Sequence, residues 1–164
     1  MEIFKTIDGY DNYKISNYGN VINDNTNKLL KSVPNSQGYH QVFLCKNGKQ
    51  TAFKIHRLVG LNFCENENNY NIVDHINRDK NNNCYDNLRW VTRSQNNRNS
   101  TKSKNTSSKY IGVSLNTRNK KWVSQITIEY CLYKLGSYDT EEEAYEAFKK
   151  AVVHFNLVDY YHNL

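Results

Sequence analysis

Three residues in this sequence, Asp74, His75 and Asn96, have types and positions that could do chemistry together. Asp74 and His75 are neighbours in a short apolar segment. Asn96 takes the fourth position of a helix that the capping-box pattern at residues 92–95 (Thr-Arg-Ser-Gln) predicts. Because helical side chains tilt toward the N-terminus of their helix, Asn96 leans back toward the preceding segment. A carboxylate and an amide oxygen are hard ligands that suit Mg²⁺, and an imidazole beside the ion can act as a general base on water.

Two short strands and a loop must position these residues. Residues 72–76 and 88–91 predict strands, and the polar residues 77–87 predict a loop between them. Neighbouring residues on a strand point to opposite sides, so Asp74 and His75 share a site only where the strand ends and the loop bends. Without a wider pattern, the simpler interpretation is a pair on the protein surface.

Hairpins and a helix are predicted upstream. Turn signals at residues 17–20 and at Asn47-Gly48 each indicate a β-hairpin, the second being the strongest short hairpin signal known. Residues 56–63 predict a short helix that begins with His56. We interpret His56 as a packing or hydrogen-bonding residue, with a supporting role beside the base as the alternative.

Several segments together resemble the HNH endonucleases of phage introns and related mobile elements. They are Ile55-His56-Arg57-Leu58-Val59, Val73-Asp74-His75-Ile76 and residues 83–92 (Asn-Cys-Tyr-Asp-Asn-Leu-Arg-Trp-Val-Thr). Residues 7–21 are similar to the NUMOD4-like module that often precedes this nuclease domain. The resemblance covers roughly residues 1–99.

The resemblance implies a ββα-metal fold and a role for each motif position. His75 corresponds to the base and Asp74 to a metal ligand. Asn87 resembles the residue that pins the loop holding the base. Asn96 stands where the family name expects a final His, a substitution that in the intron-encoded subgroup ligates the metal. The implied cofactor is Mg²⁺ or Mn²⁺.

A second module follows the polar, basic segment at residues 100–108, which reads as a linker. Residues 110–115, 122–128 and 133–138 predict three strands. A second capping box, at residues 140–143, opens an amphipathic helix. A three-stranded sheet against one helix is a complete small domain.

This C-terminal module, residues 109–156, resembles an AP2-type DNA-binding domain, in which a sheet lies in the major groove and a helix packs behind it. Along its middle strand, Trp122, Ser124, Ile126 and Ile128 are expected to face the helix. The predicted DNA contacts are Lys102, Lys104, Lys109, Ser114, Asn116, Arg118, Lys120, Lys121, Gln125, Thr127 and Lys134. A solvated basic face is the alternative interpretation.

Base recognition in this module is expected to differ from that of plant AP2 domains. Those domains place arginines to read guanines, whereas this chain has Ser114, Asn116 and Thr127 there, and Lys134 in place of a Trp. A bidentate Arg–guanine contact gives about 1–3 kcal/mol of discrimination. We therefore expect DNA affinity with looser or different base readout.

Composition agrees with a nucleic-acid partner and sets bounds on the class of protein. The 164 residues hold 22 Lys and Arg against 16 Asp and Glu, a net charge of +6. The sequence shows neither a signal-peptide pattern nor an apolar run long enough to span a membrane, so an intracellular protein is expected. The four cysteines lack a CxxC pair and are interpreted as free thiols.

Together these patterns predict an α+β chain with four segments: a NUMOD4-like module (1–55), an HNH nuclease (56–99), a linker (100–108) and an AP2-like domain (109–156). The leading hypothesis is a metal-dependent DNA endonuclease of a phage or viral mobile element. One site per chain suggests a monomer that nicks one strand of double-stranded DNA. The alternatives are a non-catalytic DNA-binding protein and, third, a nuclease acting on RNA.

Overall fold

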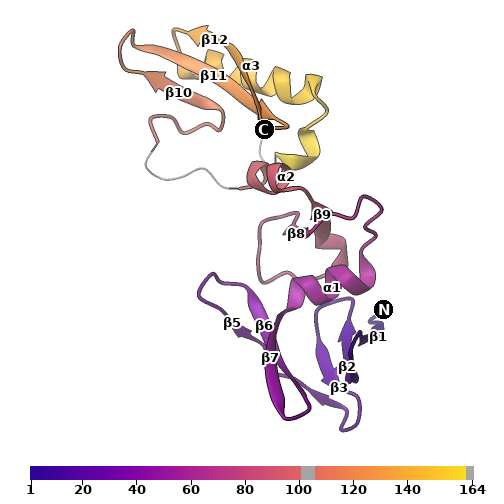
Figure 1. Cartoon of the computed structure of the whole chain (residues 1–164). Coiled ribbons are helices and arrows are strands. Elements are labelled where there is room, and N and C mark those ends of the chain that lie inside the picture. The colour runs from indigo at the N-terminus through magenta and orange to yellow at the C-terminus, as the bar shows by residue number, and fades with distance from the viewer. Residues whose placement is uncertain (101–105, 162–164) are drawn as a thin grey trace. The chain divides into compact units, whose positions relative to one another are not determined.

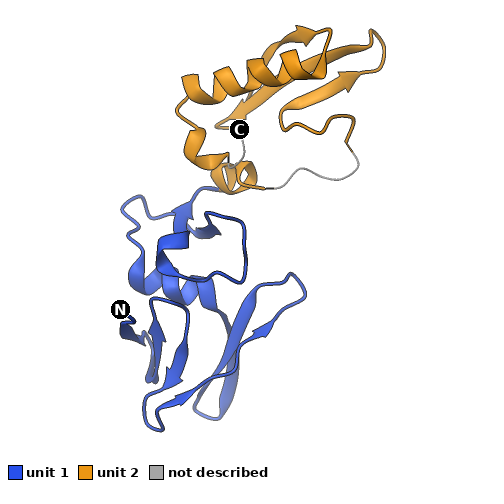
Figure 2. Cartoon of the chain, turned by 180° about the vertical axis from the view of Figure 1, so that it is seen from behind, with its two compact units in different colours: residues 1–92 blue, residues 93–164 orange. Residues whose placement is uncertain are grey.

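The computed structural model describes residues 1–100 and 106–161 and divides the chain into two compact units, residues 1–92 (unit 1) and 93–164 (unit 2) (Figures 1 and 2). Both units combine small antiparallel sheets with few helices, so the predicted α+β fold class is confirmed. Two predicted DNA contacts, Lys102 and Lys104, lie outside the described residues. Every helix within the described ranges is too short or too polar to cross a membrane.

Unit 1 contains three small antiparallel sheets around one helix. The first sheet comprises β1 (Phe4–Ile7), β2 (Tyr10–Ser16), β3 (Val21–Asn23) and β4 (Lys28–Leu29). The second comprises β5 (Val33–Pro34), β6 (His40–Lys46) and β7 (Lys49–Lys54). Then follow α1 (Ile55–Phe63), β8 (Ile72–His75), the 3₁₀ turn η1 (Tyr85–Asn87) and β9 (Leu88–Val91). Both predicted hairpins are confirmed.

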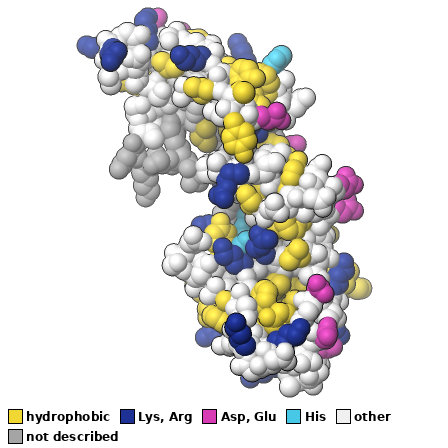
Figure 3. Space-filling model, in the orientation of Figure 1, with side chains coloured by type: hydrophobic (Ala, Val, Ile, Leu, Met, Phe, Trp, Pro, Cys, Tyr) yellow, Lys and Arg dark blue, Asp and Glu magenta, His cyan; other side chains and the backbone are white. Residues whose placement is uncertain are grey.

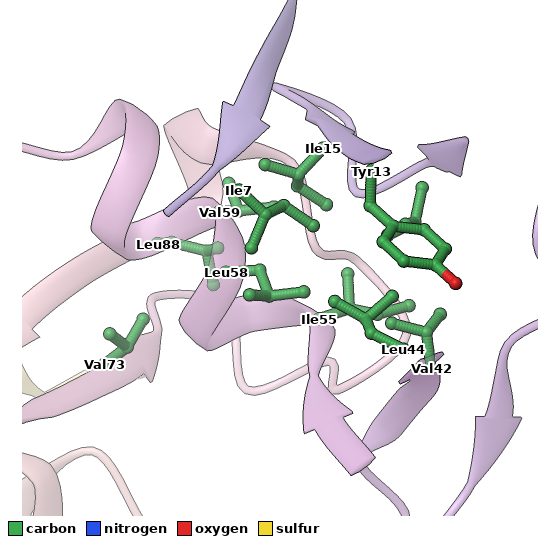
Figure 4. Packing of buried hydrophobic residues seen from close by; sticks show 11 residues of the cluster. Ile7, Tyr13, Ile15, Val42, Leu44, Ile55, Leu58, Val59, Val73 and Leu88 are labelled. Carbon is green, nitrogen blue, oxygen red and sulfur yellow. The ribbon is translucent and has the colours of Figure 1, made fainter. Parts of the chain in front are cut away.

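The core of unit 1 forms where α1 meets the strands (Figure 4). Residues Ile55, Leu58 and Val59 bury one face of α1, because positions three and four apart lie on the same side of a helix. Alternate residues of β6, Val42 and Leu44, are buried against them, as expected for a strand with one solvated face. The other core residues come from β1, β2, β3, β8 and β9: Ile7, Tyr13, Ile15, Val21, Val73 and Leu88.

Gly60 lets α1 lie directly against the β8–β9 hairpin. A Cβ added at Gly60 would lie 2.7 Å from a methyl carbon of Val73, which is closer than real Cβ contacts allow. The Trp90 indole Nε1 donates to the Gly60 carbonyl at 3.2 Å and fixes the same contact from β9. The helix therefore anchors the strand that ends in Asp74 and His75.

Unit 2 holds the predicted sheet and helix. Its elements are α2 (Arg93–Arg98), β10 (Val113–Asn116), β11 (Lys121–Ile128), β12 (Cys131–Tyr138), α3 (Glu141–His154) and η2 (Val158–Tyr160). The strand order is β10-β11-β12, and Ile126 packs with Phe148 of α3 in the core. Ser124 and Ile126 are buried whereas Thr127 is exposed, which agrees with the predicted alternation.

The first strand of this sheet begins later than the sequence suggests. The expected strand starts at Tyr110, but β10 starts at Val113. Gly112 has φ +74°, and an added Cβ there would lie 2.1 Å from the Phe148 ring. Residues 110–112 therefore turn over α3, where the Tyr110 ring stacks on Tyr145 with centroids 4.1 Å apart, before the strand can begin.

The predicted capping box at the start of α3 is confirmed and gives a stability prediction. Thr140 Oγ1 accepts from the Glu143 backbone N–H at 3.2 Å, and the Glu143 carboxylate accepts from the Thr140 N–H at 3.1 Å. Thr140→Ala removes one acceptor and is expected to lower the free energy of unfolding of unit 2 by about 1 kcal/mol. Urea denaturation followed by circular dichroism checks this. Thr140→Ser keeps the hydroxyl that accepts this hydrogen bond. Identical urea midpoints for Thr140→Ala and Thr140→Ser would therefore contradict the prediction.

Candidate active site

The β8–β9 hairpin brings Asp74 and His75 to the end of a buried strand. The antiparallel register places Asp74 opposite Arg89 and His75 opposite Leu88. Asp74 is 8% exposed and His75 is 4% exposed. A surface pair, the simpler interpretation of the sequence, is therefore wrong, since both polar side chains are held inside the fold.

His75 is oriented by a residue that sequence reasoning did not single out. The His75 Nε2 lies 3.1 Å from the Asn83 Oδ1, and the Asn83 amide nitrogen donates to the Asn81 carbonyl at 3.2 Å. That second bond fixes which end of the amide faces the ring, so Nε2 must carry the hydrogen. In the neutral ring the lone pair is then on Nδ1, which is the atom that can accept a proton.

Asn87 ties the intervening loop together. Its Oδ1 accepts from the Asn77 backbone N–H at 3.1 Å, and its amide nitrogen donates to the Asn82 carbonyl at 2.8 Å. The Asn87 carbonyl accepts from the Ile76 N–H at 2.8 Å. One side chain thus bridges both ends of the loop between His75 and η1. The catalytic role assigned to Asn87 by resemblance stays a prediction.

His56 and Tyr39 pack beside His75. The His56 ring centroid lies 5.0 Å from that of His75 and 4.8 Å from that of Tyr39, and Tyr39 lies 6.0 Å from His75. The His56 Nδ1 is buried and has no hydrogen-bond partner among the residues that the structure describes. His56 is therefore a packed neighbour of His75, and its supporting role stays a prediction.

Burial keeps both imidazoles uncharged. It lowers the pKa of His56 to about 3, with smaller contributions from His75 and Lys54, and it is also the main cause that lowers the pKa of His75. The hydrogen bond to Asn83 acts in the opposite direction on His75. Both rings are neutral at pH 7, the state in which an imidazole can accept a proton.

Two lysines lie beside this aromatic cluster. The ammonium groups of Lys54 and Lys80 are 5.1 and 4.6 Å from the centroid of the Tyr39 ring. Lys80 is exposed, and its Nζ donates to the Gln37 carbonyl at 2.8 Å. In Figure 3, histidine in unit 1 reaches the surface among Lys and Arg side chains. Two cations near a recessed neutral imidazole suit an anionic substrate.

Asp74 is paired with Arg89, whose Nε and Nη2 each lie 3.3 Å from the Asp74 Oδ2. Within the described ranges no group of three or more His, Cys, Asp or Glu side chains could hold a metal ion. Mg²⁺ needs no such group, because it typically takes one or two carboxylates together with water and substrate phosphate. Asp74 fits that donor set. Asn96 lies in α2 and belongs to unit 2, so its place beside Asp74 stays a prediction.

The predicted DNA-contacting residues of unit 2 lie on and around its sheet. The register pairs Ser114 with Val123, Asn116 with Lys121 and Gln125 with Lys134, so these residues form rows on one face. Two of the predicted cations face carboxylates. Lys109 Nζ lies 3.2 Å from Glu142, and Lys121 forms an ion pair with Asp139. Of the predicted basic contacts, Lys109, Arg118, Lys120 and Lys134 are exposed.

Comparison with known proteins gives two family matches. Residues 2–45 match the NUMOD4 motif, and residues 53–98 match the family described as HNH endonuclease. The DNA endonuclease I-HmuI of Bacillus phage SP01 is 43% identical over 90 residues, 54% of this chain and 52% of that protein. The H-N-H endonuclease F-TflII of Escherichia phage T5 is 38% identical over 98 residues, 57% of this chain and 49% of that protein.

A longer viral relative and a solved structure extend the comparison. The uncharacterized HNH endonuclease L247 of Acanthamoeba polyphaga mimivirus is 47% identical over 100 residues, 58% of this chain and 25% of that protein. The chain thus spans about half or less of these curated relatives. A solved structure that describes DNA binding and cleavage by the HNH homing endonuclease I-HmuI is also similar to this chain. The two chains align with a TM-score of 0.57 and 30% sequence identity, and the alignment covers 94% of this chain and 91% of that one.

The buried Asp–His pair on a two-stranded hairpin and these matches define the class of protein. The chain belongs to the HNH homing endonuclease family. The resemblance that residues 55–59, 73–76 and 83–92 carry is confirmed, as is the NUMOD4 module before them.

Proposed function

We propose that this protein is a metal-dependent DNA endonuclease that hydrolyses phosphodiester bonds in double-stranded DNA for a mobile element of a phage or virus. The observation that supports it most is the orientation of His75. Its ring is buried and neutral, its Nε2 hydrogen is taken up by Asn83, and Nδ1 carries the lone pair. An imidazole held this way is suited to accept a proton from water.

The proposed reaction divides the work between proton transfer and charge stabilisation. His75 Nδ1 removes a proton from water, the water oxygen attacks phosphorus, and the bond from phosphorus to the 3′-oxygen breaks. The 3′-oxygen leaves with the bonding electron pair and takes a proton from solvent. A positioned base supplies about 10²–10⁴-fold, whereas enzymes accelerate their reactions by about 10⁶-fold or more. When bound to Asp74 and Asn96, Mg²⁺ or Mn²⁺ supplies charge neutralisation at the phosphate and the leaving oxygen.

Lys54 and Lys80 are proposed to hold the phosphate that is attacked by the water molecule that His75 activates. Their ammonium groups lie beside Tyr39, which packs against both His56 and His75. Lys80 belongs to the loop that Asn87 ties, whereas Lys54 ends β7, so the two cations come from different elements. This arrangement would guide the substrate backbone to the base.

A plasmid assay tests the proposal as a whole. With Mg²⁺, the protein is expected to convert supercoiled plasmid to the nicked form, and a monomer with one site predicts nicked before linear product. Excess EDTA is expected to abolish conversion while DNA binding, measured by fluorescence anisotropy, persists. Binding without conversion in either Mg²⁺ or Mn²⁺ would instead support the alternative of a non-catalytic DNA-binding protein. Preferential cutting of RNA would contradict DNA as the substrate.

The sheet of unit 2 is proposed as an AP2-like surface that holds the duplex. Lys134 is exposed on the face opposite α3, and Arg118 lies in the turn between β10 and β11. Each phosphate contact contributes about 0.9 to the slope of log affinity against log salt. Lys134→Gln and Arg118→Gln are each expected to reduce that slope by about one. Lys150→Gln, an exposed lysine on α3, is the matched control, and an equal change in all three variants would contradict this surface.

A further inference from the structure

Unit 2 contains a cavity that the proposed nuclease reaction does not use. Its volume is about 660 Å³, within the range of about 300–1,000 Å³ that small-molecule sites occupy. It lies between α2, the C-terminal part of β11 and the segment after α3. The residues that matter for its chemistry are Arg93, Arg98, Gln125, Thr127, Tyr130 and Tyr161.

The charge of this cavity is positive. Arg93 and Arg98 line it, and none of the described lining residues is acidic. Arg98 is held in place, because its Nη2 donates to the Thr127 carbonyl at 3.3 Å and its guanidinium interacts with the Tyr161 side chain. Arg93 is exposed, so its guanidinium can meet a ligand at the mouth of the cavity. Guanidinium groups are well suited to phosphate oxygens.

Tyr130 brings an exposed aromatic ring to the same cavity. It is 87% exposed, and it occupies the two-residue turn between β11 and β12 together with Glu129. Both turn residues have positive φ, +46° at Glu129 and +68° at Tyr130. Such turns favour Asn and Gly, so a glutamate and a tyrosine here hold the backbone in a disfavoured conformation. The Tyr130 ring is therefore held in solvent by a turn whose backbone conformation is disfavoured for these residues.

We propose that this cavity binds one unpaired nucleotide of a DNA strand, with the base stacked on Tyr130 and its phosphate against Arg93 and Arg98. Stacking on an aromatic side chain requires a base that has left the helical stack, whereas the outer face of the sheet suits an intact duplex. The combination of cations with an exposed ring is typical of surfaces that hold single strands. The inference rests on the proposed function, because it assumes that the nucleic acid bound by this protein is DNA.

Binding of a short single strand to the full chain tests this site. A fluorescently labelled pentathymidylate is titrated with the protein in EDTA, so that no cleavage occurs, and anisotropy gives the dissociation constant. Tyr130→Ala is expected to weaken binding at least about fivefold, and Tyr130→Phe to retain it, because the ring provides the stacking surface. Tyr18→Ala removes a half-exposed tyrosine from unit 1 and is the matched control, with unchanged affinity expected.

An abasic pentamer with the same phosphates separates stacking from charge. It is expected to bind the wild type more weakly than pentathymidylate and to be insensitive to Tyr130→Ala. Equal affinity of the two oligonucleotides, or equal affinity of wild type and Tyr130→Ala for pentathymidylate, would overturn the proposed site. Plasmid nicking measured on the same samples distinguishes the two proposals: nicking with no Tyr130-dependent strand binding overturns only this site, and Tyr130-dependent binding without nicking overturns only the nuclease.

Discussion

Replacing His75 with alanine is expected to slow plasmid nicking by about 10²–10⁴-fold at saturating Mg²⁺, because the variant lacks the group that accepts the proton of the attacking water. Duplex binding, measured by anisotropy, is expected to change little, since the lysines at Tyr39 and the sheet of unit 2 remain in place. The rate is followed as conversion of supercoiled to nicked plasmid under single-turnover conditions.

Two further variants separate the base from its surroundings. Asn83→Ala leaves the imidazole present but removes the acceptor at 3.1 Å that fixes its tautomer. Asn83→Ala is expected to reduce the nicking rate less than His75→Ala does. In the double variant, Asn83→Ala is expected to reduce the rate little further, since both changes act on one group. His154→Ala, an exposed histidine at the end of α3, is the matched control. Nicking by His75→Ala within tenfold of the wild type would exclude His75 as the base.

Local signals in the sequence were sufficient to predict several elements of the fold. The Asn47-Gly48 turn gave the β6–β7 hairpin, and the capping box gave the start of α3, because each depends on residues within a few positions of one another. The resemblance pointed to Asp74 and His75 in the same way, as neighbours in one motif.

The partners of those two residues could not be predicted, because they depend on tertiary structure. Three consecutive asparagines, residues 81–83, occupy the loop, and only its folded path shows that Asn83 faces the His75 ring while Asn82 lies against Asn87. Tyr39, the residue just before β6, joins the histidines although it is far from them in sequence. An alternating or capping pattern carries no signal for such contacts.

Arg89 shows the same limit and bears on the metal-binding role proposed for Asp74. The register of β8 against β9 places its guanidinium on Asp74, so a carboxylate that is 8% exposed carries a compensating cation. Burying a carboxylate without such a partner is costly. The ion pair therefore offsets the cost of burying the Asp74 carboxylate at the end of β8, and a divalent cation bound at the proposed site would have to compete with Arg89 for it.

Asp74→Asn is expected to be as damaging to nicking as loss of the base. Charge stabilisation at the phosphate contributes several kcal/mol, so a loss of about 10³-fold is expected at saturating Mg²⁺, together with weaker binding of Mn²⁺ in calorimetric titrations. The asparagine can still accept a hydrogen bond from Arg89, so the folded structure is expected to persist. Asp74→Ala removes the carboxylate that Arg89 contacts and is expected to destabilise unit 1 more than Asp74→Asn does.

The control for this prediction is Asp24→Asn, which removes a carboxylate from an ion pair with Lys14 at 2.7 Å in the same unit. That pair is more exposed and is expected to matter little to either nicking or Mn²⁺ binding. If Asp74→Asn and Asp24→Asn nicked equally fast and bound Mn²⁺ equally well, Asp74 would serve only to neutralise Arg89, and the metal would have to be held elsewhere. If Asp74→Asn alone lost both, the buried ion pair would be established as the metal-binding part of the site.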